Sequence, residues 1–155
     1  MKNWEMKFIA DSGILNLTSH SLDAAHAYKV VSFKTRVRNA VDALAKAQEA
    51  FLKEAGIDDP QAFDARRTEL NKKEIRKLTK AEAQELTDLN AKMERFNQLT
   101  LAQMNEDANI EPKAMPYDQW KALQDENKDI KAQGVELLTL CEAQLEGILW
   151  KAPEE

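Results

Sequence analysis

The sequence has little cysteine, glycine, proline or aromatic residue, and these shortages exclude several classes of protein. The one cysteine, Cys141, has no second cysteine in the chain to pair with, which excludes a disulfide-stapled domain and favours a reducing compartment. Aromatic residues make up 6% of the 155 residues, and only four glycines and four prolines interrupt the chain. Such a composition is thin for a compact β protein.

Long apolar runs are also missing. No stretch approaches the roughly 18–20 apolar residues that cross a membrane, and the apolar stretch at 8–10 is too short for a signal-peptide core. The formal net charge is −5, so no overall field attracts nucleic acid or anionic lipid. We therefore expect a cytoplasmic protein with no membrane contact.

Catalytic and metal-binding motifs are absent from the sequence too. It contains no Gly-rich phosphate loop, no Gly-x-Ser-x-Gly, no zinc-ligand spacing and no Rossmann fingerprint. The pair Asp23 and His26 offers too few ligands for a metal, so His20 and His26 are expected to be exposed or to cap a helix. Cys141 has no neighbouring base and is expected in the core. We predict no enzyme activity, cofactor or metal.

What the sequence has in quantity is strong helix formers, and the clearest pattern begins at Ser21, which we expect to cap a long helix. Apolar residues follow at heptad spacing, with polar Lys34 and Gln48 at two positions of the same row. A helix over 22–55 would be about 50 Å long, and Gly56 would end it. The row consists of Ala27, Val30, Val37, Val41, Leu44, Phe51 and Ala55.

A second heptad row predicts a return helix. Asp59 and Pro60 start a helix over 60–77 without a clean apolar register, and a Thr-x-x-Glu capping box at 79–82 starts the next helix, which reaches Met104. Two heptad helices joined by a modest connection pack most simply as an antiparallel pair. The second row consists of Leu86, Leu89, Met93, Phe96 and Thr100.

The two ends of the chain complete the predicted fold. Residues 1–20 fit either a strand pair or short helical pieces, and we favour the helical pieces; residues 106–116 are expected to be an extended crossing segment. A helix over 135–149 would cover the base of the hairpin, where Trp4, Trp120 and Trp150 would gather. We predict a single all-α domain over 1–155, an antiparallel hairpin (21–105) of two long coiled-coil-like helices with C-terminal helices in 106–155.

Charge is distributed unevenly along the chain. Residues 66–80 hold seven basic and two acidic groups, whereas residues 106–155 hold five basic and twelve acidic groups. The basic segment could contact phosphates, but it lacks the interleaved aromatic residues that stack on bases. A solvated face or a protein contact is the favoured interpretation, with nucleic-acid binding as the alternative. The basic residues are Arg66, Arg67, Lys72, Lys73, Arg76, Lys77 and Lys80.

The layout resembles a loose group of small phage- and prophage-encoded helical proteins without assigned function. The likeness rests on AAHAYKVVSFKTRVRNAV (24–41), AQEAFLKEAGI (47–57), the extended ANIEPKAMP (108–116) and the terminal helix (135–149). The chain departs from the group at 66–80, which is longer. The resemblance implies a phage-related accessory or assembly role in a bacterial cytoplasm and supplies no catalytic residues.

These observations predict a non-enzymatic interaction or assembly protein whose long helices present a surface to a partner or to a second copy. Val31, Phe33 and Leu52 lie beside the heptad row rather than in it, and we expect them to stay exposed when the hairpin forms. Because large exposed apolar patches are rare on monomers, a homodimer is favoured, in which Lys34 and Gln48 would fix the register.

Overall fold

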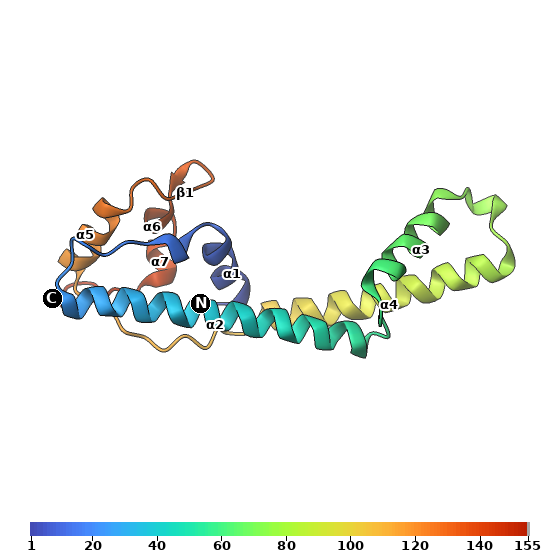
Figure 1. Ribbon diagram of the computed structural model, residues 1–155, viewed down its shortest axis with the longest axis horizontal. Coiled ribbons are helices and arrows are strands. Elements are labelled where there is room, and N and C mark those ends of the chain that lie inside the picture. Colours follow the sequence, from blue (N-terminus) through green and yellow to red (C-terminus); the bar gives the residue numbers. More distant parts are fainter. Residues whose placement is uncertain (155) are drawn as a thin grey trace. The chain divides into compact units, whose positions relative to one another are not determined.

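A computed structural model describes residues 1–154 and shows a mostly helical chain (Figure 1), which confirms the all-α class in outline. Two short 3₁₀ turns, η1 (Ile14–Asn16) and η2 (Ile75–Lys77), and a two-stranded hairpin of β1 (Lys131–Ala132) and β2 (Val135–Glu136) complete the elements. The helices are α1 (Asn3–Asp11), α2 (Ala24–Glu54), α3 (Pro60–Lys72), α4 (Lys80–Met104), α5 (Tyr117–Glu126), α6 (Leu137–Leu140) and α7 (Glu142–Leu145).

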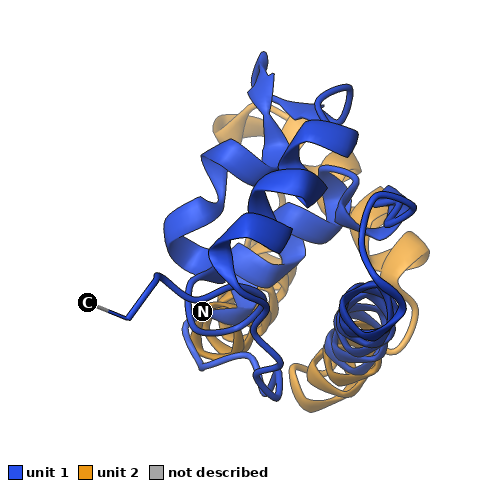
Figure 2. Cartoon of the chain, turned by 90° about the vertical axis from the view of Figure 1, so that its left-hand side faces the viewer, with its two compact units in different colours: residues 1–44, 105–155 blue, residues 45–104 orange. Residues whose placement is uncertain are grey.

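The chain divides into two compact units, coloured separately in Figure 2. Unit 1 comprises residues 1–44 and 105–155, and unit 2 comprises residues 45–104. Helix α2 contributes its first part to unit 1 and its end to unit 2. We describe each unit separately, and the single domain expected over the whole chain stays a prediction.

The N-terminal 20 residues of unit 1 adopt the helical alternative. Met6 and Ile9 lie three positions apart on one face of α1, and both are buried. Gly13 has a φ of 104°, a left-handed conformation that glycine adopts without a steric penalty, and it turns the chain from α1 into η1. Because Ile14 and Leu17 after this turn are also buried, the segment contributes to the core of unit 1.

The first part of α2 is buried along the predicted row except at one turn, where Phe33 is buried in place of Lys34. Val30, Phe33, Val37 and Leu44 are buried in the core of unit 1, so the expectation that Phe33 is exposed is wrong. The ring of Phe33 buries more apolar surface than the stem of Lys34 could, and Lys34 lies beside the row, donating from Nζ to the Leu17 carbonyl at 2.7 Å. Lys34 is thus engaged within the chain, and its role in the register of a dimer stays a prediction.

The start of α2 also differs from the prediction. The helix begins at Ala24, and Asp23 caps it by accepting from the His26 backbone N–H at 2.9 Å. Ser21, the predicted cap, instead donates from its hydroxyl to the Ala122 carbonyl at 3.3 Å. The structure places the cap on the Asp23 carboxylate, whose negative charge also favours the positive end of a helix.

The predicted single helix over 135–149 is broken into smaller pieces. Gln133 and Gly134 have φ values of 53° and 78°, and they form the two-residue turn that joins β1 to β2. Cys141 separates α6 from α7. The apolar residues still face the core as their spacing indicated; these residues are Leu137, Leu138, Cys141, Leu145 and Leu149.

The crossing segment is extended, as expected, and backbone hydrogen bonds attach it to the C-terminal part of unit 1. The Met115 N–H donates to the Leu149 carbonyl at 2.8 Å, and the Lys151 N–H donates to the Met115 carbonyl at 3.0 Å. Trp120 and Trp150 stack nearby, with ring centroids 5.8 Å apart. Trp4 is not part of this pair and is 51% exposed, so only two of the three tryptophans pack as predicted.

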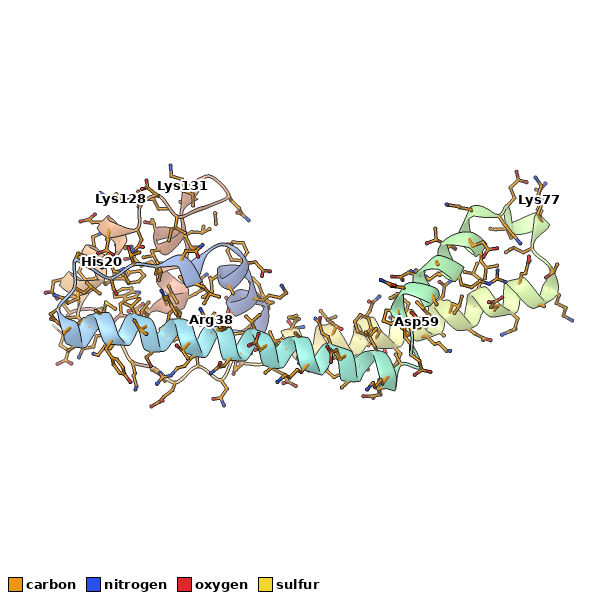
Figure 3. All side chains as sticks on the ribbon, viewed as in Figure 1. His20, Arg38, Asp59, Lys77, Lys128 and Lys131 are labelled. Atoms are coloured by element: carbon orange, nitrogen blue, oxygen red, sulfur yellow. The ribbon has the colours of Figure 1, made fainter. Side chains whose placement is uncertain are left out.

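Unit 2 contains the local signals that the sequence predicted. Gly56 has a φ of 81° after the end of α2, and Asp59 caps α3 by accepting from the Ala62 N–H at 3.1 Å (Figure 3). Thr79 and Glu82 exchange both hydrogen bonds of the capping box, at 3.1 and 3.2 Å, at the start of α4. The small core consists of buried Ala55, Ile57 and Phe63, packed against half-buried Leu52, Leu89, Met93 and Phe96.

Candidate interaction surfaces

The basic segment of unit 2 runs from α3 through η2 to the first residue of α4, and its first arginine fastens two helices together. Arg66 donates from Nε and Nη2 to the two carboxylate oxygens of Glu85, each at 2.8 Å, and from Nη1 to Glu69 at 3.0 Å. The hydrogen bonds from Arg66 lower the pKa of Glu85 below its usual value. A two-pronged pair of this kind fixes orientation as well as charge, so Arg66 has a structural role.

Three more basic side chains of the segment also have partners. Arg67 donates to the Asn90 side chain at 3.0 Å, and Lys73 pairs with Glu82 at 2.7 Å. The hydrogen bond from Lys73 lowers the pKa of Glu82. Lys77, which extends away from the helices at η2 (Figure 3), pairs with Glu74 at 3.3 Å. These contacts remove part of the positive charge that the sequence suggested was available.

The remaining basic side chains form the surface that we call the tip, together with one isoleucine. Lys72, Arg76 and Lys80 are exposed and make no side-chain hydrogen bond or ion pair with any residue in 1–154. Ile75 lies among them in η2 and is 88% exposed. The tip therefore combines an apolar side chain with three unpaired cations.

The three apolar residues predicted to stay exposed have three different environments. Val31 is 51% exposed on α2 of unit 1, as expected, and Tyr28, one turn earlier, is 65% exposed. Leu52 is half-buried against the core of unit 2, and Phe33 is buried in the core of unit 1. The structure therefore leaves a small patch of Tyr28 and Val31, whose tyrosine the sequence analysis missed.

Unit 1 also contains a pocket of about 290 Å³, which we call the Trp4 pocket. Helix α1 supplies Trp4, Glu5, Phe8 and Ile9 to one side. Trp4 is 51% exposed and Leu140 is 36% exposed, so apolar surface is accessible in the pocket. Its volume is close to the lower limit of typical ligand pockets. The β1–β2 turn, α6 and α7 supply the rest of the lining, namely Gln133, Leu140, Cys141 and Gln144.

The chemistry of the Trp4 pocket suits apolar binding. Burial raises the pKa of the Cys141 thiol, and the negative charge of Glu5 raises it further, so the thiol is protonated at neutral pH. The Glu5 carboxylate accepts from the Lys2 backbone N–H at 2.7 Å as part of a helix cap. Among the described residues, neither a histidine nor a lysine lines the pocket. The pocket therefore offers Cys141 no base, and it is a hydrophobic cavity with the Glu5 carboxylate beside it.

Other titratable groups of unit 1 hold the backbone in place. Asp23 lies 2.7 Å from His26 Nδ1, and hydrogen bonds from His26 lower the pKa of Asp23. Glu126 accepts from the backbone N–H groups of His20 and Ser21. Burial raises the pKa of Glu126, but hydrogen bonds from Thr18, Ser21 and His20 lower it more, to about 2. Within residues 1–154, no three His, Cys, Asp or Glu side chains gather where they could hold a metal ion.

Comparison with known proteins finds no matching family model, no similar curated protein and no similar solved structure. None of the helices within residues 1–154 is both long and apolar enough to span a membrane. No residue role can therefore be transferred from a relative, and the candidate surfaces are interpreted from their own geometry.

Proposed function

We propose that this protein is a non-catalytic interaction or assembly protein whose long helices bind a partner or a second copy of the chain. The observation that supports this most strongly is the incomplete burial of α4. This helix has 25 residues and none of them is buried, although it carries a heptad row. All members of the row are half-buried: Leu86, Leu89, Met93, Phe96 and Thr100.

A half-buried heptad row favours coiled-coil-like association. An amphipathic helix gains most of its stability from covering its apolar face, and the small core of Ala55, Ile57 and Phe63 offers little cover. A helix from a partner or from a second copy would complete the burial. We therefore propose a homodimer as the simplest assembly, in which the hairpin of long helices takes part.

The test is light scattering behind a sizing column, at low and high salt, with and without a mixed-sequence DNA fragment. We expect an oligomer that survives high salt, because apolar burial is not screened by ions, and that ignores DNA. A chain that stays monomeric at every concentration and has no protein partner would contradict the proposal.

Nucleic-acid binding is the second candidate, and the unpaired Lys72, Arg76 and Lys80 favour it. Three phosphate contacts would make the logarithm of the affinity fall with the logarithm of the salt concentration at a slope of about −2 to −3. A monomer that co-elutes with DNA at low salt and releases it at high salt would replace the first proposal with this one. The phage-related role and the cytoplasmic location rest on the resemblance and composition alone, and we retain them as proposals.

A further inference from the structure

Ile75 lies at the tip, at the start of the 3₁₀ turn η2. The Lys77 N–H donates to the Glu74 carbonyl at 2.8 Å within η2, and the ion pair of Lys73 with Glu82, at 2.7 Å, connects the end of α3 to the start of α4. Leu70 before the turn is completely buried, so it fills the interior in place of Ile75. The isoleucine is thus presented to solvent on a turn whose two flanking helices are joined by an ion pair.

The Trp4 pocket complements the tip in both polarity and charge. Its apolar side chains surround a volume of about 290 Å³, which is ample for the side chain of one isoleucine. A neighbouring hollow shares Glu5 and Gln144 with the pocket and is also lined by Met1 and Glu146. The lysines of α1 and of its cap are neutralised, since Lys7 pairs with Asp11 at 2.6 Å and Lys2 pairs with Asp107 at 2.8 Å. Glu5 in the pocket and Glu146 in the adjoining hollow form what we call its acidic rim.

We propose that Ile75 of one copy inserts into the Trp4 pocket of a second copy, with the cations of the tip facing Glu5 and Glu146. Charge complementarity identifies the occupant, because the apolar group surrounded by unpaired cations and the apolar pocket with an acidic rim belong to the same chain. This inference rests on the proposed function, since it specifies one contact of a self-assembling protein. The tip and the pocket are different surfaces, so two assemblies are open. If each of two copies inserts its tip into the pocket of the other, a closed dimer forms, and if each copy binds the next one along, a chain of copies forms.

Two variants that each disable one surface test this contact. Ile75→Glu removes the apolar side chain and adds charge at the tip, whereas Leu140→Arg places a cation in the pocket that repels the tip. We expect each variant to raise the concentration at which half the chains associate by about tenfold or more, because burying an aliphatic side chain is worth roughly that factor in affinity. Val135→Gln, at another exposed aliphatic residue that is 45% exposed and belongs neither to the long helices nor to the pocket lining, is the matched control and should change it less than twofold.

Mixing the two variants gives the sharpest result. Ile75→Glu keeps an intact pocket and Leu140→Arg keeps an intact tip, so an equimolar mixture should form a heterodimer through one contact although each variant alone is dissociated. Differently tagged variants allow the pair to be detected by light scattering and co-purification. A mixture that stays dissociated contradicts the contact, even if both variants fold and the wild type associates.

Fluorescence quenching tests the contact in the unaltered chain. Trp120 is fully buried and Trp150 is 7% exposed, so acrylamide acts mainly on Trp4, which is 51% exposed. Dilution through the association range should increase quenching, because the tip leaves the pocket. If the chains associate without a change in quenching, or if association resists both substitutions, this contact is contradicted but the proposed function is not. If the wild type is monomeric at every concentration, self-assembly itself is contradicted.

Discussion

The two units of the chain use different physical means to hold their helices. Unit 1 buries a contiguous core in which Trp120, Leu123, Leu137 and Leu145 are completely inaccessible. Unit 2 has a small core around Phe63 and relies more on caps and ion pairs. Because buried apolar area contributes more to stability than exposed ion pairs do, unit 2 should open first and unit 1 should set the global stability.

The largest effect is expected at Trp120. Its ring is completely buried and stacked on Trp150, and its indole N–H donates to Glu142 at 2.9 Å. Trp120→Ala should lower the free energy of unfolding by about 3–5 kcal/mol, measured by urea denaturation of unit 1. Trp4→Ala, at a half-exposed tryptophan, should change it by less than about 1 kcal/mol. Equal losses in the two variants would contradict the difference in burial.

A smaller and more local effect is expected at Phe63 in unit 2. Its side chain is 9% exposed and packs in the small core with Ala55 and Ile57. Phe63→Ala should remove about 3 kcal/mol from the local stability of unit 2. Hydrogen exchange should then accelerate in α3 and α4 while the amides of α5 keep their protection. Leu101→Ala, at a residue 64% exposed, is the control, and uniform acceleration in both units would show that the units do not open independently.

Basic side chains of unit 2 should stabilise it only where they make well-aligned ion pairs. Arg66 binds both carboxylate oxygens of Glu85, whereas Arg76 is unpaired within the described residues. Arg66→Gln should speed exchange at the α3 amides and make it less sensitive to salt, because the screened attraction is gone. Arg76→Gln should leave exchange unchanged. If the two variants behave alike, the paired arginine does not fasten α3 to α4.

The sequence could predict the features that depend on neighbouring residues, and it could not predict those that depend on tertiary packing. The cap at Asp59, the capping box at Thr79 and the C-cap at Gly56 were all predicted correctly, since each depends on residues within one helical turn of each other. The burial of Phe33 in place of Lys34 was missed, because strict heptad spacing assigned that turn to Lys34, and which of two adjacent side chains faces the core depends on what packs against the helix.

The candidate surfaces also differ in whether the sequence could have revealed them. Ile75 could have been singled out, since it is the one aliphatic residue among the charged residues of 72–77. The Trp4 pocket could not, because α1 and α6 meet only through tertiary packing. The break at Cys141 was missed for a related reason: the apolar spacing over 135–149 describes which side chains face the core and does not require one continuous helix.

The smallest expected effect concerns acid and the segment that precedes α2 in unit 1. The pKa of Glu126 is about 2 in the folded chain and has an ordinary value of 4.5. A lowered pKa means that the folded state favours the charged carboxylate. Its stabilisation is therefore fully present above about pH 4.5, and it is lost as the pH falls from there towards 2.

Hydrogen exchange at His20 and Ser21 reports this change directly, because both backbone N–H groups donate to Glu126. Their protection, corrected for intrinsic exchange, should fall between pH 4.5 and about 2, and Glu126→Gln should flatten the profile in that range. Acid also weakens the pairs of Glu82 and Glu85 in unit 2, whose pKa values are lowered by Lys73 and Arg66. Glu126→Gln separates the acid response of unit 1 from that of unit 2, since it leaves the acid response of the α3 amides unchanged. If protection at Ser21 persists to pH 2.5 in the wild type, the Glu126 carboxylate does not hold the segment that precedes α2.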